Sequence, residues 1–99
     1  MIFMNHLMLA KFKPEYSENQ KSEMFADIRK IYDHAKTLPG VHDVEYHENC
    51  IDRPNRCDIS VNIIMDREAL PLWDACEWHS KWKSEYGHTL EAKCIFDYE

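Results

Sequence analysis

The stretch that decides how this chain folds stands at its start: Ile2-Phe3-Met4-Asn5-His6-Leu7-Met8-Leu9-Ala10-Lys11-Phe12. With the two-residue period of a β-strand, one face carries Met4, His6, Met8, Ala10 and Phe12, and the other carries Phe3, Asn5, Leu7 and Leu9. Both faces are mostly apolar, so both need covering, and one of them carries a titratable imidazole. We therefore expect a central strand with helices on one side and a partner subunit on the other.

The length and composition limit the kinds of protein and partner that are compatible with this chain. Ninety-nine residues make a single domain, residues 1–99, and a chain this short with extra apolar surface often completes its burial by self-association. Eighteen acidic against twelve basic residues give a formal charge of −6, which argues against nucleic acid or an anionic membrane as a partner. No apolar run approaches the roughly 20 residues of a membrane span, and no basic region precedes the first apolar stretch. We expect a soluble cytoplasmic protein.

The four cysteines, Cys50, Cys57, Cys76 and Cys94, are scattered and form no C-x-x-C pair. This spacing argues against a classical zinc site or a redox motif. Cys50 and Cys57 flank a predicted loop and can approach one another, so their redox state stays open. In a reducing cytosol we expect four free thiols.

The first helix is predicted to open at Ser17 or Glu18 and to stop at Pro39-Gly40. Its apolar residues recur at helical spacing with charges between them. These residues are Met24, Phe25, Ile28, Ile31, Ala35 and Leu38.

Two strands follow, over residues 41–49 and 57–65, with a turn-rich segment at 52–55 between them. Asp66 is a candidate N-cap for a short helix over 67–75, which Pro71 strains early. A further helix is expected over 79–91 and a closing strand over 93–98. The order βαββαβ predicts an α+β, ferredoxin-like fold with a four-stranded antiparallel sheet and helices on one face. The bare sheet face predicts a sheet-to-sheet dimer.

The strand over 57–65 alternates between two sets of side chains. We assign the apolar set to the dimer face: Ile59, Val61, Ile63 and Met65. The alternating set looks at water or into a wet cavity under the helices: Asp58, Ser60, Asn62 and Ile64. The pattern alone favours water, because half-solvated antiparallel strands are common.

Four segments together resemble the stress-responsive dimeric α/β-barrel family, called Dabb. They are Asn5 to Lys13, Leu38 to Val41, Glu68 through His79, and Ile95 to Tyr98. The resemblance runs over the whole chain in the right order. It implies a homodimer whose two sheets pack into a barrel, with a pocket in each subunit between the sheet and the helices.

The plant olivetolic acid cyclases of this family fold a linear polyketide by aldol condensation without a cofactor. The resemblance matches two of their pocket histidines to His6 and His79. At three other pocket positions it places Trp73 and Ile28 where those enzymes have tyrosines, and Asp58 where they have a histidine. An indole offers only an N–H donor and cannot act as a base. The two histidines therefore carry over, and the full cyclase constellation does not.

His79 is our first candidate for a catalytic group, because a neutral imidazole in an apolar corner can take a proton from an acidic C–H or polarise a carbonyl. The alternative is a structural histidine bonded to a backbone carbonyl. His6, on the helix-facing side of its strand, can act as its partner, or both rings can bond buried water. Asp58 can hold an imidazole in one tautomer; alternatively it is a solvated strand start beside Arg56.

The predicted ligand-binding wall combines large flat and adaptable side chains, which suit a flat hydrophobic ligand. The alternative for each is core packing. The candidates are Met8, Met24, Phe25, Ile28, Ser60, Trp73 and Trp82.

The other histidines, His34, His42, His47 and His88, are expected at the surface. Asp43, Glu45 and His47 alternate along one strand and can in principle ligate a metal. Three polar residues on one face more commonly mean solvation, so we expect neither a metal nor a cofactor.

Three function classes remain open. The first is cofactor-free, histidine-based acid–base chemistry, of cyclase, lyase or isomerase type, on a small flat carbonyl or phenolic compound. The second is a non-catalytic, stress-associated dimer that binds such a molecule. The third is a haem or quinone-type monooxygenase of the same superfamily.

Overall fold

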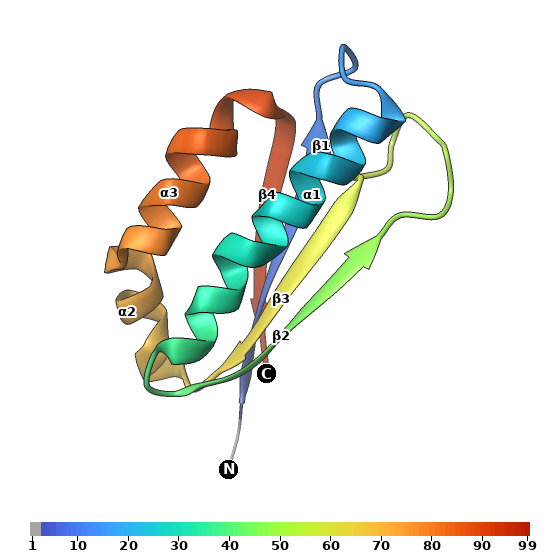
Figure 1. Ribbon diagram of the computed structural model, residues 1–99. Coiled ribbons are helices and arrows are strands. Elements are labelled where there is room, and N and C mark those ends of the chain that lie inside the picture. Colours follow the sequence, from blue (N-terminus) through green and yellow to red (C-terminus); the bar gives the residue numbers. More distant parts are fainter. Residues whose placement is uncertain (1–2) are drawn as a thin grey trace.

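The opening apolar stretch forms an inner strand of a four-stranded antiparallel sheet in the order β2-β3-β1-β4 (Figure 1). The structure, a computed structural model, describes residues 3–99, so Ile2 of the predicted first strand lies outside the described residues. The predicted βαββαβ order and ferredoxin-like α+β class are confirmed. The elements are β1 (Met4–Phe12), α1 (Glu18–Asp33), β2 (Val41–Glu48), β3 (Ile59–Met65), α2 (Leu70–Ala75), α3 (Glu77–Tyr86) and β4 (Leu90–Tyr98).

A capping box opens α1 where the sequence places its start. The Gln20 amide donates to Ser17 Oγ at 3.1 Å, and the Ser17 amide donates to Gln20 Oε1 at 2.8 Å. Such a cap satisfies two of the free amides at a helix start and stabilises it by about 1 kcal/mol. The regular helix ends at Asp33, earlier than predicted, and a 3-10 turn over His34–Thr37 leads to the Pro39-Gly40 break.

The later helices differ in detail from the sequence pattern. Pro71 lies in the first turn of α2, where its missing N–H costs little. Asp66 makes no side-chain cap, and its Oδ1 instead accepts from His42 Nε2 at 2.9 Å. The predicted helix over 79–91 ends at Tyr86, since Leu90 already pairs with Phe12 in the sheet.

The register between β1 and β3 corrects the predicted facing of the third strand. His6 lies opposite Ile63, and Met8 opposite Val61, so the apolar set of β3 lies on the helix-facing side. All four of its members are buried there: Ile59, Val61, Ile63 and Met65. The assignment of this set to the dimer face was therefore wrong. Alternation fixes which residues share a face, but only pairing with β1 decides which face meets the helices.

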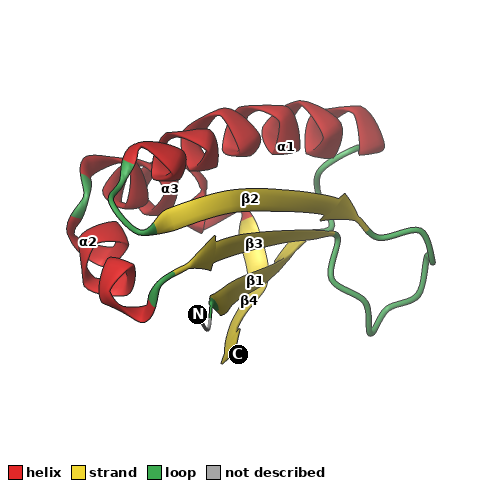
Figure 2. Cartoon of the chain, turned by 90° about the horizontal axis from the view of Figure 1, so that it is seen from below, coloured by secondary structure: helices red, strands yellow, loops and turns green. Residues whose placement is uncertain are grey.

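Both long helices lie on one side of the sheet, and no helix or strand of residues 3–99 covers the other side (Figure 2). The β1–β4 part of this open face is largely apolar, and the β2 part is polar. By register the open face presents Leu7 and Leu9 from β1, Ile64 from β3, Phe96 and Tyr98 from β4, and Asp43, Glu45 and His47 from β2. Among residues 3–99, no helix has both the length and the apolar character needed to cross a membrane.

Candidate functional site

His6 and Asp97 form an imidazole–carboxylate pair across two neighbouring strands. His6 is only 8% exposed and lies on the helix-facing side of β1. Asp97 is its direct partner in the β1–β4 ladder, and Nδ1 of His6 is 2.5 Å from Oδ1 of Asp97. Because a carboxylate only accepts, Nδ1 of the ring is the donor and Nε2 is the outer nitrogen. The pair fixes the ring in one orientation and one tautomer.

The strand that supplies Asp97 is an exposed sheet edge. Lys93, Ile95 and Asp97 alternate on its helix-facing side, opposite Ala10, Met8 and His6 in turn. All three side chains are exposed, although the β1 residues that they pair with are buried. We call these three residues the β4 shelf. It forms the exposed edge beside the His6–Asp97 pair.

His79 lies in the first turn of α3 and is half-buried. Its Nδ1 donates to the Asp74 carbonyl at 3.1 Å, which leaves Nε2 as the free lone pair. Burial lowers the pKa of His79, and nearby Lys83 and Lys93 lower it further, while Asp74 opposes this. The ring is therefore neutral near pH 7 and is able to accept a proton.

Aromatic side chains pack behind His79. The ring of Trp73 meets His79 edge-on, with centroids 5.3 Å apart. Tyr32 of α1 lies 5.0 Å from Trp73 and 5.5 Å from Trp82, and burial raises its pKa well above the usual value. Sequence reasoning missed Tyr32, although its helical spacing from Ile28 and Ala35 was the available signal. The cluster forms a rigid apolar support for the histidine.

Comparison with known proteins gives a clear result for the fold alone. No protein-family model matches the chain, and no curated protein matches its sequence. A dimeric ferredoxin-like protein of unknown function from Bacteroides fragilis has 14% identity and a TM-score of 0.81, covering 98% of this chain and 95% of its own. A Dabb family protein from Mesorhizobium loti gives 14% identity and a TM-score of 0.76 over the same shares of both chains. This chain has the Dabb-type fold.

A hydroxynitrile lyase from Passiflora edulis has the same Dabb-type fold. Its identity to this chain is 11% and its TM-score is 0.75, covering 97% of this chain and 91% of its own. At this level of identity the likeness concerns the fold. Solved structures with the Dabb-type fold thus include an enzyme as well as proteins of unknown function.

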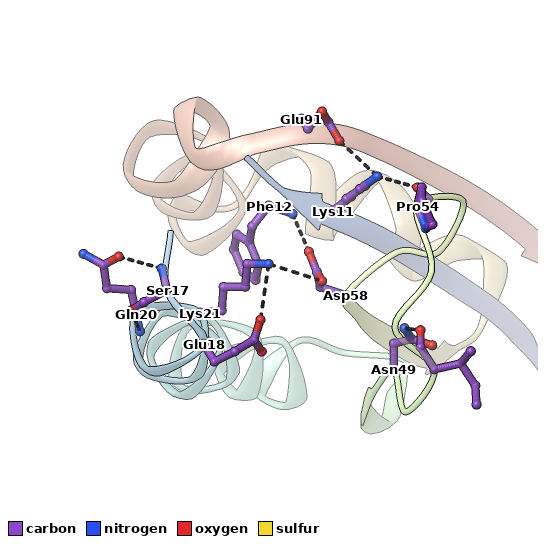
Figure 3. A network of polar contacts seen from close by, with 11 residues as sticks. Lys11, Phe12, Ser17, Glu18, Gln20, Lys21, Asn49, Pro54, Asp58 and Glu91 are labelled. Atoms are coloured by element: carbon purple, nitrogen blue, oxygen red, sulfur yellow. Dashed lines mark hydrogen bonds and ion pairs between the residues drawn. The ribbon is translucent and has the colours of Figure 1, made fainter. Parts of the chain in front are cut away.

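Asp58 lies apart from His6. Its Oδ2 accepts from the Phe12 amide at 2.8 Å, and its Oδ1 is 3.8 Å from Lys21 Nζ (Figure 3). Phe12 is six residues along β1 from His6, which is about 20 Å of strand. The carboxylate that holds the His6 imidazole is Asp97, not Asp58. No local pattern indicates this contact, because it joins the two ends of the chain.

The structure places the residues of the predicted ligand-binding wall at several separate locations. Phe25 lines a hollow of about 90 Å³ beside Asp58, and Met24 lines another hollow between α1 and Tyr86. Ser60 lies on the open sheet face, opposite Leu9, so the structure does not bring it together with the histidines. The core takes up the remaining four: Met8, Ile28, Trp73 and Trp82.

The expected surface position of the other histidines is confirmed for His34, His42, His47 and His88. All four cysteines are free thiols. Within residues 3–99, no three side chains of His, Cys, Asp and Glu come together in a way that could hold a metal ion.

Proposed function

We propose that this chain is a homodimeric enzyme that performs cofactor-free acid–base chemistry on a small, flat carbonyl compound beside the β4 shelf. The observation that carries the proposal is the His6–Asp97 pair, with Nδ1 and Oδ1 2.5 Å apart on a buried ring next to an exposed edge. A carboxylate behind an imidazole orients it and stabilises the imidazolium formed when it takes up a proton. This arrangement suits a group that holds and returns a proton within one turnover.

The two histidines divide the proton transfers between them. His79 is neutral because burial lowers its pKa, so its Nε2 is suited to remove the first proton. The His6–Asp97 pair carries a proton on its outer nitrogen when charged, and is suited to stabilise and protonate a developing oxyanion. Neither role requires a redox change.

Lyase chemistry is the reaction class that the two histidines can serve most simply. Cleavage of a hydroxynitrile breaks one C–C bond after a base removes the hydroxyl proton; the C–C electron pair leaves with cyanide, which takes up a proton. The Passiflora edulis enzyme of the same fold is described by that activity. An aldol cyclisation also needs two proton transfers: a base removes a proton from a carbon next to a carbonyl, and the new oxyanion takes up a proton. Both reactions remain within the proposal.

The open sheet face supports a homodimer. Phe96 is 59% exposed there, next to Tyr98 at 43% and beside Leu7. On the same face Asn62 donates from Nδ2 to Asn5 Oδ1 at 2.9 Å, while the Oδ1 of Asn62 is buried without a partner. A buried hydrogen-bond acceptor without a donor is unusual in a folded protein. Solved structures of this fold are described as dimeric, which supports a second copy as the cover of this face.

The test is turnover of an aromatic hydroxynitrile and of a panel of aromatic aldehydes and ketones. Mandelonitrile cleavage is followed by benzaldehyde absorbance against the uncatalysed rate, and the carbonyl panel by product analysis. We expect catalysis by the wild type, a loss of at least tenfold in His79→Ala and His6→Ala, and no change in His88→Ala. The exposed His88 makes this variant a matched control. Full activity in both site variants would refute the proposal.

A second candidate, a non-catalytic binder of the same class of molecule, is favoured by the closed packing of Trp73, Trp82 and Tyr32. This packing buries all three rings in the core. Saturable binding of a panel compound without conversion, unaffected by His79→Ala, would select this candidate over the enzyme.

A further inference from the structure

Lys93 is a cation placed on the reacting side of the sheet. It lies opposite Ala10 in the β1–β4 ladder, on the same side as Asp97, whose carboxylate is bonded to His6. Alternation puts Ile95 between them on that side. The strand rise places Lys93 and Asp97 about 13 Å apart along β4. The β4 shelf is thus charged at both ends and apolar in its middle.

The ammonium of Lys93 also lies toward α3. It is close enough to His79 to lower the pKa of that ring, together with Lys83. His6 lies beside the Asp97 end of the shelf. A molecule lying on Ile95 therefore has the His6–Asp97 pair at one end and the Lys93 ammonium at the other.

The charge on Lys93 is not taken up by the protein. Lys11, Lys21 and Lys36 each have a carboxylate within 4.0 Å, but among residues 3–99 no ion pair involves Lys93. The carboxylate at the other end of the shelf is already engaged by His6. An exposed lysine on a flexible stem beside an apolar side chain is suited to hold an anionic group at an adjustable position.

We propose that the β4 shelf binds aromatic carboxylates, with the carboxylate on Lys93 and the flat ring on Ile95. This deepens the proposed function by giving its substrate class a charge, so that the preferred compounds are aromatic acids carrying a reactive carbonyl. The reactive group then lies between Lys93 and the His6–Asp97 pair. The negative charge of Asp97 is kept away from the bound carboxylate by the length of the shelf.

The experiment compares two ligands that differ in one charge. Benzoylformate is anionic, and its methyl ester is the neutral counterpart with the same ring and ketone. Dissociation constants are measured by calorimetry or NMR titration in low salt, on wild type, Lys93→Met, Lys93→Arg and Lys13→Met. Lys13 lies just beyond β1 and serves as a control for the loss of one positive charge.

We expect the wild type to bind benzoylformate more tightly than the ester. Lys93→Met should weaken benzoylformate binding by about fivefold or more and leave the ester unchanged, because a charge-assisted contact at an exposed site has about that strength. Lys93→Arg should retain most of the preference, and Lys13→Met all of it. An amide spectrum of each variant confirms that it is folded.

Three results would overturn the inference. They are absence of benzoylformate binding to the wild type, equal affinity for acid and ester, and an equal loss of both ligands in Lys93→Met. The readout is binding, so a chain that prefers the acid but turns over nothing would retain this site and lose the proposed catalysis. A chain that cleaves mandelonitrile without preferring the acid would retain the catalysis and lose this site.

Discussion

Asp97 lies directly opposite His6 in the β1–β4 ladder, and its Oδ1 is 2.5 Å from His6 Nδ1 although 91 positions separate them in the chain. The first and last strands lie side by side in the sheet (Figure 1). The candidate site therefore forms only when the end of the chain has docked against its beginning.

Replacing Asp97 with Asn should impair catalysis more than stability. The amide has no negative charge to stabilise an imidazolium and can present either an acceptor or a donor to the ring. We expect turnover to fall at least tenfold. The Asp97 side chain is 40% exposed, so the loss in the free energy of unfolding should be only about 1 kcal/mol. Steady-state kinetics and urea denaturation measure the two effects.

Asp66→Asn is the matched control for this change, since Asp66 also binds an imidazole, that of His42, at 2.9 Å. This pair is exposed and joins β2 to the end of β3, whereas the β4 shelf is at the opposite edge of the sheet. Turnover should be unchanged in the control. An equal loss of activity in both variants would show that Asp97 has no special role.

The pKa of His79 should lie below the value of about 6.5 typical of an unfolded chain. Burial is the main cause, Lys83 and Lys93 add to it, and Asp74 opposes it. Above pH 6.5 the ring is neutral in both states and stability is independent of its titration. As the pH falls below 6.5 the unfolded chain binds the proton first, so the free energy of unfolding decreases until the pH passes the lower folded pKa.

An NMR titration of the His79 ring protons measures this pKa directly. Lys93→Met removes one of the positive charges and should move the pKa upward. A pKa at or above 6.5 in the wild type would contradict the described burial of His79.

The two glycines should respond to alanine in opposite directions. Gly40 has a φ of 85°, and an added Cβ would come within 3.3 Å of the Ala69 Cβ. Gly40→Ala should therefore cost about 1–2 kcal/mol in the free energy of unfolding. Gly87 has helical angles and open space around it, so Gly87→Ala should stabilise by about 0.4–1 kcal/mol. Denaturant unfolding of both variants checks the pair.

An acidic side chain on the open sheet face should break the dimer. Phe96→Asp would place a charge within the apolar part of that face, next to Tyr98. Burying an unpaired charge costs several kcal/mol, so we expect a monomer. Light scattering coupled to size-exclusion chromatography measures the mass in solution.

Ile51→Asp provides the comparison, because Ile51 is also an exposed apolar residue, 46% accessible, but lies in the β2–β3 loop. Its mass in solution should equal that of the wild type. A monomeric wild type, or loss of the dimer in both variants, would contradict an interface on the open face.

The sequence predicted the order of elements well because each depends on neighbouring residues. The alternation from Met4 to Phe12, the Ser17 cap and the Pro39-Gly40 break act within a few positions of themselves. The end of α3 was predicted too late, because Leu90 is drawn into the sheet by pairing with Phe12. The side of the sheet on which the apolar residues of β3 lie was also predicted wrongly, because pairing with the distant strand β1 determines that side.

The candidate site also combines features that depend on neighbouring residues with contacts that depend on strand pairing. The sequence by itself determined that His6 lies on a strand with two apolar faces and that His79 opens a helix among aromatic residues. Only the tertiary structure decided that Asp97, rather than Asp58, holds His6, and that Lys93 shares its side of the sheet. Local periodicity fixes which side chains share a face, whereas contacts between distant strands depend on a register that forms only when the sheet assembles.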